Sequence, residues 1–260
     1  MPPHTSSLLA VTRDISPAIA QCELTHLDRA PIDLARAKSE HDAYEATLRE
    51  LGCEVRRLTA GPHMADSVFI EDTAIVLDEL AVITRPGAES RRAETAAVAA
   101  TLRTLRPVAA VLAPGTLDGG DVMLVGRALY VGIGYRTNEA GVGQLRSIVS
   151  SQGYTVDAVP FDGCLHLKSA VSIVADDLLL VNPQWVDARR FGDMRVIEID
   201  PAEPFAANAL RVHDSIVYSA EHVRTAARLE AAGLDVRRVP AGELAKAEGA
   251  VTCCSLILRA

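Results

Sequence analysis

The sequence predicts an α/β fold in which a strand–strand–helix–strand unit repeats around a central axis. The unit recurs about every 40 to 50 residues, a period typical of repeat architectures. Reactive or polar residues precede the first strand of successive units, with gaps of 52, 48, 42 and 45 residues. These residues are Asp66, Asp118, His166, Asn208 and Cys253. Five units would form a closed or nearly closed ring, and because no linker interrupts the chain we expect a single domain, residues 1–260.

The first units are read from hydrophobic periodicity, with spacing of three or four residues marking helices and short apolar runs marking strands. The expected elements are a helix at 33–52 and a strand at 53–59, then strands at 67–77 and 80–84, a helix at 87–105 and a strand at 108–113.

The same order continues to the C-terminus. The expected elements are strands at 121–126 and 128–134, a helix at 137–153, a strand at 154–160, a strand pair in 169–181 without a clear helix after it, two strands in 208–219, a helix at 220–233 and a strand at 234–240. The final apolar run at 254–258 is expected to join the N-terminal unit and close the ring.

Composition argues against several classes of protein. The net charge is −8 and the basic residues are scattered, so we do not expect a nucleic-acid partner. No apolar run approaches the ~18 residues of a membrane span. The N-terminus lacks the basic and apolar regions of a signal peptide. The five cysteines fit neither a disulfide framework nor a CxxC metal site, so we expect a cytoplasmic protein without a metal.

The ring arrangement predicts that the regularly spaced polar residues lie close together. If the units surround an axis, two acids, a histidine, an amide and a cysteine meet at one mouth. A cysteine in that setting is a candidate nucleophile. The alternative is that Cys253 and Cys254 pack as small apolar side chains in a final strand.

Six motifs in order carry a resemblance that extends over nearly the whole chain. They are DSVFIED (66–72), ITRPGAESRRAE (83–94), LDGGDV (117–122), YRTN (135–138), LHLKS (165–169) and EGAVTCCS (248–255). With these motifs the chain resembles the dimethylarginine dimethylaminohydrolase family, in the guanidine-modifying (pentein) superfamily of five-bladed α/β propellers.

The resemblance implies three catalytic residues. Cys253 corresponds to the nucleophile, His166 to the general acid and base, and Asp118 to the carboxylate that orients this histidine. Cys254 is then expected to point to the opposite face of the final strand, because side chains alternate along a strand.

The resemblance also implies a set of substrate contacts. Asp72, with Glu71 beside it, corresponds to the acid that holds a guanidinium; Asp66 to a contact with the α-amino group; Arg91 and Arg136 to the pair that binds the α-carboxylate; Ser169 to a member of the histidine motif; and Ala247 and Glu248 to backbone carbonyls that face the substrate. A lid loop near the N-terminus is expected to contribute a residue near Ile19.

The chemistry fits these residue types. A guanidinium carbon is a poor electrophile and calls for a thiolate nucleophile, which a nearby cation must activate because a free thiol has a pKa of ~8.5. The leaving amine needs a proton, which a histidine can supply. No metal or organic cofactor is required. The expected partner is a small cationic guanidine amino acid, and the expected assembly is a monomer or homodimer.

The leading hypothesis is a hydrolase that converts Nω-methylated L-arginine, such as asymmetric dimethylarginine or monomethylarginine, to L-citrulline and a methylamine through a cysteine thiouronium intermediate. One alternative is a deiminase acting on arginine or another guanidine. A second is a non-catalytic pentein, like the translation initiation factors of this fold that bind a ribosomal subunit. A third alternative is a cysteine hydrolase of amides. Such an enzyme requires an oxyanion hole rather than a ring of acids, so the carboxylates argue against it.

Overall fold

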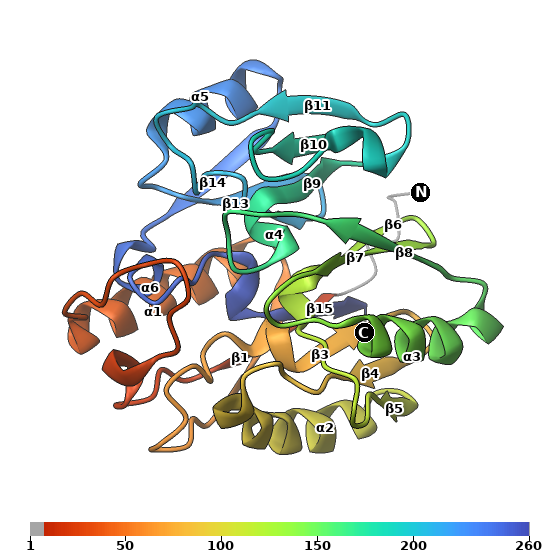
Figure 1. The fold of residues 1–260 in the computed structure, drawn as a ribbon. Helices are drawn as coiled ribbons and strands as arrows, with labels where there is room; N and C mark the ends of the chain where they lie inside the picture. Colours follow the sequence, from red (N-terminus) through yellow and green to blue (C-terminus); the bar gives the residue numbers. More distant parts are fainter. Residues whose placement is uncertain (1–7, 260) are drawn as a thin grey trace, which may run out of the picture.

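The structure is a computed structural model, and it describes residues 8–259. Within these residues the strands form five sheets of three strands each. In every sheet the first strand runs antiparallel to the second, and the second runs parallel to the third. The sheets lie toward the middle of the molecule and the longer helices lie outside them (Figure 1). The fold is therefore the predicted five-bladed α/β propeller.

Each sheet is one blade, and four blades are continuous in the chain. They contain β3 (Ala74–Val76), β4 (Ala81–Ile83) and β5 (Val108–Ala110); β6 (Val122–Val125), β7 (Ala128–Ile133) and β8 (Thr155–Pro160); β9 (Val171–Ala175), β10 (Leu178–Val181) and β11 (Arg195–Glu198); and β12 (Leu210–Val212), β13 (Ser215–Ser219) and β14 (Asp235–Val239).

The fifth blade joins the two ends of the chain. The strand β1 (Leu8–Arg13) pairs in parallel with β2 (Cys53–Leu58) and antiparallel with β15 (Leu256–Arg259). The register places Leu8 opposite Arg259 and Val11 opposite Leu256. This pairing confirms the prediction that the C-terminal strand joins the N-terminal unit.

The helices form the parallel crossovers within the blades. They are α1 (Leu34–Glu50), α2 (Thr95–Arg103), α3 (Glu139–Val149) and α5 (Val223–Ala231), with α6 (Gly242–Ala245) on the way to the final blade. The side chain of Asp33 caps α1 and that of Asn138 caps α3 by accepting backbone N–H groups. Between β10 and β11 the crossover contains only the 3₁₀ turn Ala188–Phe191, as the sequence predicted for this unit.

Two strands were not expected from the sequence. The strand β11 has the sequence RVIE and is mostly exposed, so it carries little hydrophobic signal. The strand β1 is apolar and largely buried, but no element was expected before residue 33.

The buried core is mostly aliphatic. Its fully buried side chains include Leu102, Leu129, Leu145, Leu179 and Ile216, which come from different blades and crossovers. Within residues 8–259, none of the helices has both the length and the hydrophobicity that crossing a bilayer requires.

One-turn helices lead into the first strands of four blades. They are the 3₁₀ turns η2 (Ile70–Thr73), η4 (Gly119–Asp121) and η7 (Thr252–Cys254), and the short helix α4 (Leu167–Ala170). The strands expected at these positions were therefore wrong in part. Residues 70–73 of the expected strand at 67–77 form a turn, and Cys254 lies in η7 rather than in the final strand.

Candidate active site

The one-turn helices bring distant residues together because they pack against one another. The turn η2 contacts both η4 and η7, and α4 contacts η4. Asp72 lies in η2, Asp118 immediately precedes η4, His166 immediately precedes α4, and Cys253 lies in η7. Each predicted catalytic side chain is thus fixed by the turn that begins a blade.

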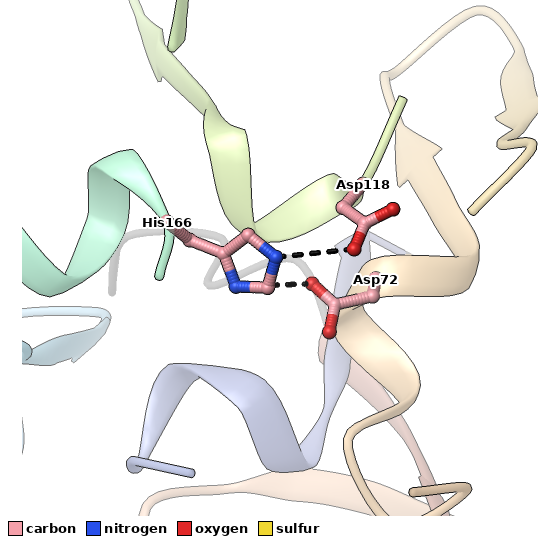
Figure 2. Close-up of side chains that lie close together, drawn as sticks. All are labelled: Asp72, Asp118 and His166. Atoms are coloured by element: carbon pink, nitrogen blue, oxygen red, sulfur yellow. Dashed lines mark hydrogen bonds and ion pairs between the residues drawn. The ribbon is translucent and has the colours of Figure 1, made fainter. Parts of the chain in front are cut away.

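A buried histidine faces two carboxylates (Figure 2). His166 Nε2 lies 3.1 Å from Asp118 Oδ2, and Nδ1 lies 3.8 Å from Asp72 Oδ1. Burial disfavours the charged imidazolium, but Asp72, the hydrogen bond to Asp118 and the nearby Asp121 outweigh burial and raise the pKa of His166 to about 9. The imidazole is therefore protonated at neutral pH and can act as an acid.

Asp72 remains ionised in spite of its burial. Burial favours its neutral form, yet the charges of His166 and Arg91 and two hydrogen bonds lower its pKa to about 2. The bonds come from Arg91 Nη1 at 2.5 Å and from the backbone N–H of Gly120 at 2.9 Å. A fixed negative charge therefore lies in the site before any ligand binds.

The two adjacent cysteines have different surroundings. Cys253 reaches a small cavity, and burial together with the negative charges of Glu71 and Asp72 raises the pKa of its thiol to about 12. Cys254 does not line this cavity, and its thiol donates to the carbonyl of Ala250 at 3.5 Å. The two side chains diverge as expected, but the cause is the 3₁₀ turn and not strand alternation.

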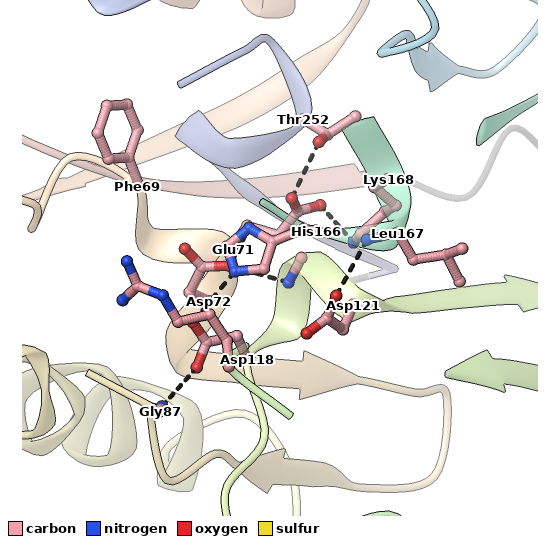
Figure 3. A network of polar contacts seen from close by, with 12 residues as sticks. Phe69, Glu71, Asp72, Gly87, Asp118, Asp121, His166, Leu167, Lys168 and Thr252 are labelled. Carbon is pink, nitrogen blue, oxygen red and sulfur yellow. Dashed lines mark hydrogen bonds and ion pairs between the residues drawn. The ribbon is translucent and has the colours of Figure 1, made fainter. Parts of the chain in front are cut away.

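A second set of polar contacts ties the turns together (Figure 3). The Glu71 carboxylate accepts from Lys168 Nζ at 2.5 Å and from Thr252 Oγ1 at 2.9 Å. Asp121 accepts from the backbone N–H of Leu167 at 3.0 Å. It also accepts from the hydroxyl of Thr137 at 2.6 Å. Glu71 therefore connects η2 to α4 and η7, and Asp121 connects η4 to α4.

Two glycines allow this close packing. A Cβ atom on Gly119 would lie 2.0 Å from the carbonyl oxygen of Glu71. A Cβ atom on Gly120 would lie 2.7 Å from both Asp72 Oδ1 and His166 Nδ1. The glycine pair of the LDGGDV motif is thus required by close approach to the site, which goes beyond its role as an ordinary turn.

Most of the predicted site residues surround one cavity, which we call the catalytic cavity. Its lining residues are Glu23, Asp66, Phe69, Asp72, Arg91, Arg136, Leu165, His166, Ala247, Glu248 and Cys253. Asp118 lies behind this lining and bonds to His166. Glu71 also lies behind it and bonds to Thr252 and Lys168. Ser169 and Asn208 lie beside a neighbouring cavity, and Asn208 bonds to Thr252 instead of reaching the thiol.

The two arginines of the cavity differ in their bonding. Arg91 is buried and already donates to Asp72, to Glu94 at 2.9 Å and to the carbonyls of Asp66 and Phe69. Arg136 is buried as well, but its guanidinium is linked only weakly to Thr25, at 3.4 Å. Of the two, Arg136 has the guanidinium more available to a ligand carboxylate.

Residues 23–27 form a segment across one side of the catalytic cavity, here called the lid segment. The N–H of Glu23 donates to both carboxylate oxygens of Asp66 at 3.2 Å. The Glu248 carboxylate accepts from the consecutive N–H groups of Thr25, His26 and Leu27, at 2.5 to 3.0 Å for its Oε1. The backbone of Glu248 has φ +57°, a conformation that costs free energy for any residue other than glycine.

The lid contribution was expected near Ile19, and it comes from a residue close by rather than from Ile19 itself. Its side chain is almost fully buried and packs in the hydrophobic core with Ile15 and Cys22. Glu23 is the residue of this region that lines the catalytic cavity.

The side chain of Glu248 is expected to hold the lid segment, because it accepts three of its backbone N–H groups. Changing Glu248 to alanine should raise KM and speed amide hydrogen exchange at residues 25–27, since those donors lose their acceptor. A matched control is Glu230→Ala, which removes an exposed glutamate on α5. Unchanged exchange at residues 25–27 would show that other contacts hold the lid segment.

Several residues of the site were not assigned roles from the sequence. Glu94, Asp121, Thr137, Lys168 and Thr252 all bond directly to site residues or to their supports. Each lies inside one of the six sequence motifs. Their presence as polar residues in a motif could have indicated a role in the site. The sequence did not show which residue from another blade each of them would contact.

The donor set Asp72, Asp118 and His166 could also hold a cation. Their ligand atoms all lie within 4.8 Å of one another. A metal would have to displace the proton from His166, whose pKa of about 9 makes this costly at neutral pH.

Comparison with known proteins gives a consistent answer. A family model described as "N,N dimethylarginine dimethylhydrolase, eukaryotic" matches residues 25–215. An N(G),N(G)-dimethylarginine dimethylaminohydrolase of Streptomyces coelicolor is 40% identical over 251 residues, which cover 96% of each chain.

Solved structures agree with the sequence comparison. A dimethylarginine dimethylaminohydrolase from Pseudomonas aeruginosa, a cysteine-to-serine variant complexed with citrulline, superposes with a TM-score of 0.92 at 32% identity, covering 96% of this chain and 98% of that one. A histidine-to-glycine variant of a dimethylarginine dimethylaminohydrolase, in an adduct with S-methyl-L-thiocitrulline, has a TM-score of 0.91 at 32% identity with the same coverage.

Proposed function

The chain belongs to the dimethylarginine dimethylaminohydrolase family, and from this premise we propose that it hydrolyses Nω-methylated L-arginine to L-citrulline and a methylamine. The observation that carries the proposal is a cavity whose lining combines a thiol, a protonated histidine, an ionised carboxylate, two arginines and Asp66. This arrangement complements a molecule with a guanidinium, an α-amino group and a carboxylate.

Substrate binding is proposed to activate the nucleophile. A thiol with a pKa of about 12 is neutral at pH 7. A guanidinium held beside Asp72 brings a positive charge next to Cys253 and favours its thiolate. The unbound protein would then carry an unreactive thiol, and the thiolate would form where its target is already in place.

The proposed reaction has two halves. The Cys253 thiolate bonds to the guanidinium carbon, and the bond from that carbon to the methylated nitrogen breaks as His166 donates its proton to the leaving amine. The product is a cysteine S-alkylthiouronium. Neutral His166 then takes a proton from water as the water oxygen bonds to the same carbon. The carbon–sulfur bond breaks, the sulfur takes the remaining hydroxyl proton, and citrulline and the neutral Cys253 thiol are released.

Asp118 and Asp72 are proposed to set the protonation state of His166. Asp118 accepts from Nε2 and is itself held by the backbone N–H of Gly87 at 2.8 Å. We expect kcat/KM for dimethylarginine to fall as pH rises through about 9, because the imidazolium that protonates the leaving amine is lost there. A pH profile of citrulline release checks this, and a flat profile up to pH 10 would contradict it.

The experiment that tests the function is a citrulline assay with asymmetric dimethylarginine, monomethylarginine and arginine side by side. Turnover of the two methylated substrates supports the proposal. Turnover of arginine alone would instead support the deiminase hypothesis, and absence of citrulline from all three would support a non-catalytic role.

Arg136 is proposed to bind the substrate carboxylate. Arg136→Ala should raise KM for dimethylarginine by about 10- to 150-fold, the equivalent of ~1.5–3 kcal/mol for a hydrogen bond to a charged group. The effect should shrink for agmatine, a guanidine without the carboxylate. Equal losses for both substrates would assign Arg136 a structural role.

Arg91 serves as the contrast in this experiment. Removing its guanidinium takes the ion-pair partner of the buried Glu94 carboxylate and one of the two partners of Asp72, and breaking a buried pair typically costs ~3–5 kcal/mol. Arg91→Ala should therefore lower the melting temperature as well as activity, whereas Arg136→Ala should leave the melting temperature nearly unchanged.

A further inference from the structure

A second cavity, of about 390 Å³, lies next to the catalytic cavity, and we call it the side chamber. Its walls come from the segment 26–30, from the residues around His166 and from the segment 241–251. Leu165 and Glu248 line both the side chamber and the catalytic cavity. These two residues therefore form the partition between the two spaces.

Leu165 is placed beside the bond that breaks in the proposed reaction. It immediately precedes His166, whose imidazolium must face the leaving nitrogen in order to protonate it. Alkyl groups on that nitrogen must then lie against the wall that His166 and Leu165 form. Leu165 also lines the side chamber, so this wall separates the leaving nitrogen from that space.

The side chamber suits an alkyl group better than a charged one. Its lining is mostly apolar and includes Leu27, Phe205, Ala245 and Val251. Two of its charged lining residues already have partners, since Lys246 Nζ lies 2.7 Å from Glu243 and the Glu248 carboxylate holds the lid segment. An apolar substituent would therefore be favoured there without displacing an ion pair.

We propose that Leu165 is the specificity-determining residue for the substituent on the leaving nitrogen: it limits this substituent to the size of methyl groups, and the side chamber behind it accommodates longer alkyl chains once Leu165 is shortened. The inference rests on the proposed hydrolysis of Nω-substituted arginine. It assigns the side chamber a ligand class, the N-alkyl chain of a substituted guanidine.

The test compares wild type and Leu165→Ala on Nω,Nω-dimethylarginine and Nω-butylarginine, which both release citrulline. The variant is expected to raise the ratio of kcat/KM for butylarginine over dimethylarginine at least ~10-fold, because each methylene in an apolar pocket is worth about 10- to 200-fold. In the Leu165→Ala background, Ala245→Phe should reverse this gain, because Ala245 lines only the side chamber.

The outcomes separate the inference from the proposed function. Wild type that hydrolyses dimethylarginine, with a ratio unchanged in Leu165→Ala, would overturn the role of Leu165 alone. Wild type that hydrolyses no methylated arginine would overturn both. If Leu165→Ala does not fold, the smaller change Leu165→Val decides, since it should shift the ratio in the same direction.

Discussion

Replacing Cys253 by serine is expected to abolish citrulline formation, whereas replacing Cys254 by serine should leave most of it. The expected loss for Cys253→Ser is on the order of 10⁴-fold or more in kcat, because a hydroxyl is a far weaker nucleophile toward a guanidinium than a thiolate. Cys254→Ser keeps a donor for the Ala250 carbonyl, so its effect should be a modest loss of stability. Steady-state citrulline release measures both variants.

The pair Cys253 and Cys254 is a matched control within one turn. Both thiols are buried and both have a raised pKa, so neither burial nor thiol acidity distinguishes them. Only position does, since Cys253 lines the catalytic cavity and Cys254 does not. Intact-protein mass spectrometry after mixing with substrate should place the substrate-derived mass on Cys253. An adduct on Cys254 would exchange the two roles.

The repeat was readable because each blade is nearly self-contained in sequence. A hairpin, an amphipathic helix and a returning strand each leave a local hydrophobic period, and these periods located the helices of four blades. The crossover between β10 and β11 lacks such a helix, and the third strand of that blade, Arg195–Glu198, is polar and exposed. A short polar strand leaves no period to read, so β11 was missed.

The site was harder to read because it is built from non-local contacts. Residues 70–73 look like part of a strand, since a buried one-turn helix and a buried strand have the same apolar composition. Only packing of η2 on η4 turns Asp72 toward His166 and Gly120. Arg91 bonds to Glu94, and Glu248 accepts hydrogen bonds from the lid segment. Both contacts form only once the chain has folded into the ring, and no local sequence pattern predicts them.

Replacing His166 by glycine is expected to stop turnover without unfolding the protein. Both carboxylates that face the imidazole keep a partner without it, since Asp72 retains Arg91 and the N–H of Gly120, and Asp118 retains the N–H of Gly87. A bound guanidinium can still favour the Cys253 thiolate, so some covalent adduct should form. Its hydrolysis should be the most impaired step, because no base remains beside the thiouronium.

The measurements are intact-protein mass after mixing with substrate, a thermal melt, and citrulline release with and without added imidazole. Imidazole should restore part of the rate, because general-base catalysis needs only a group of suitable pKa within reach of the water.

His41→Gly is a matched control, since His41 is also buried and lies beside a carboxylate, that of Glu45, but is absent from the catalytic cavity. It should lower the melting temperature and retain turnover. A His166→Gly variant with wild-type turnover would remove the histidine from the mechanism, and one inactive only because its melt collapses would make it a structural residue.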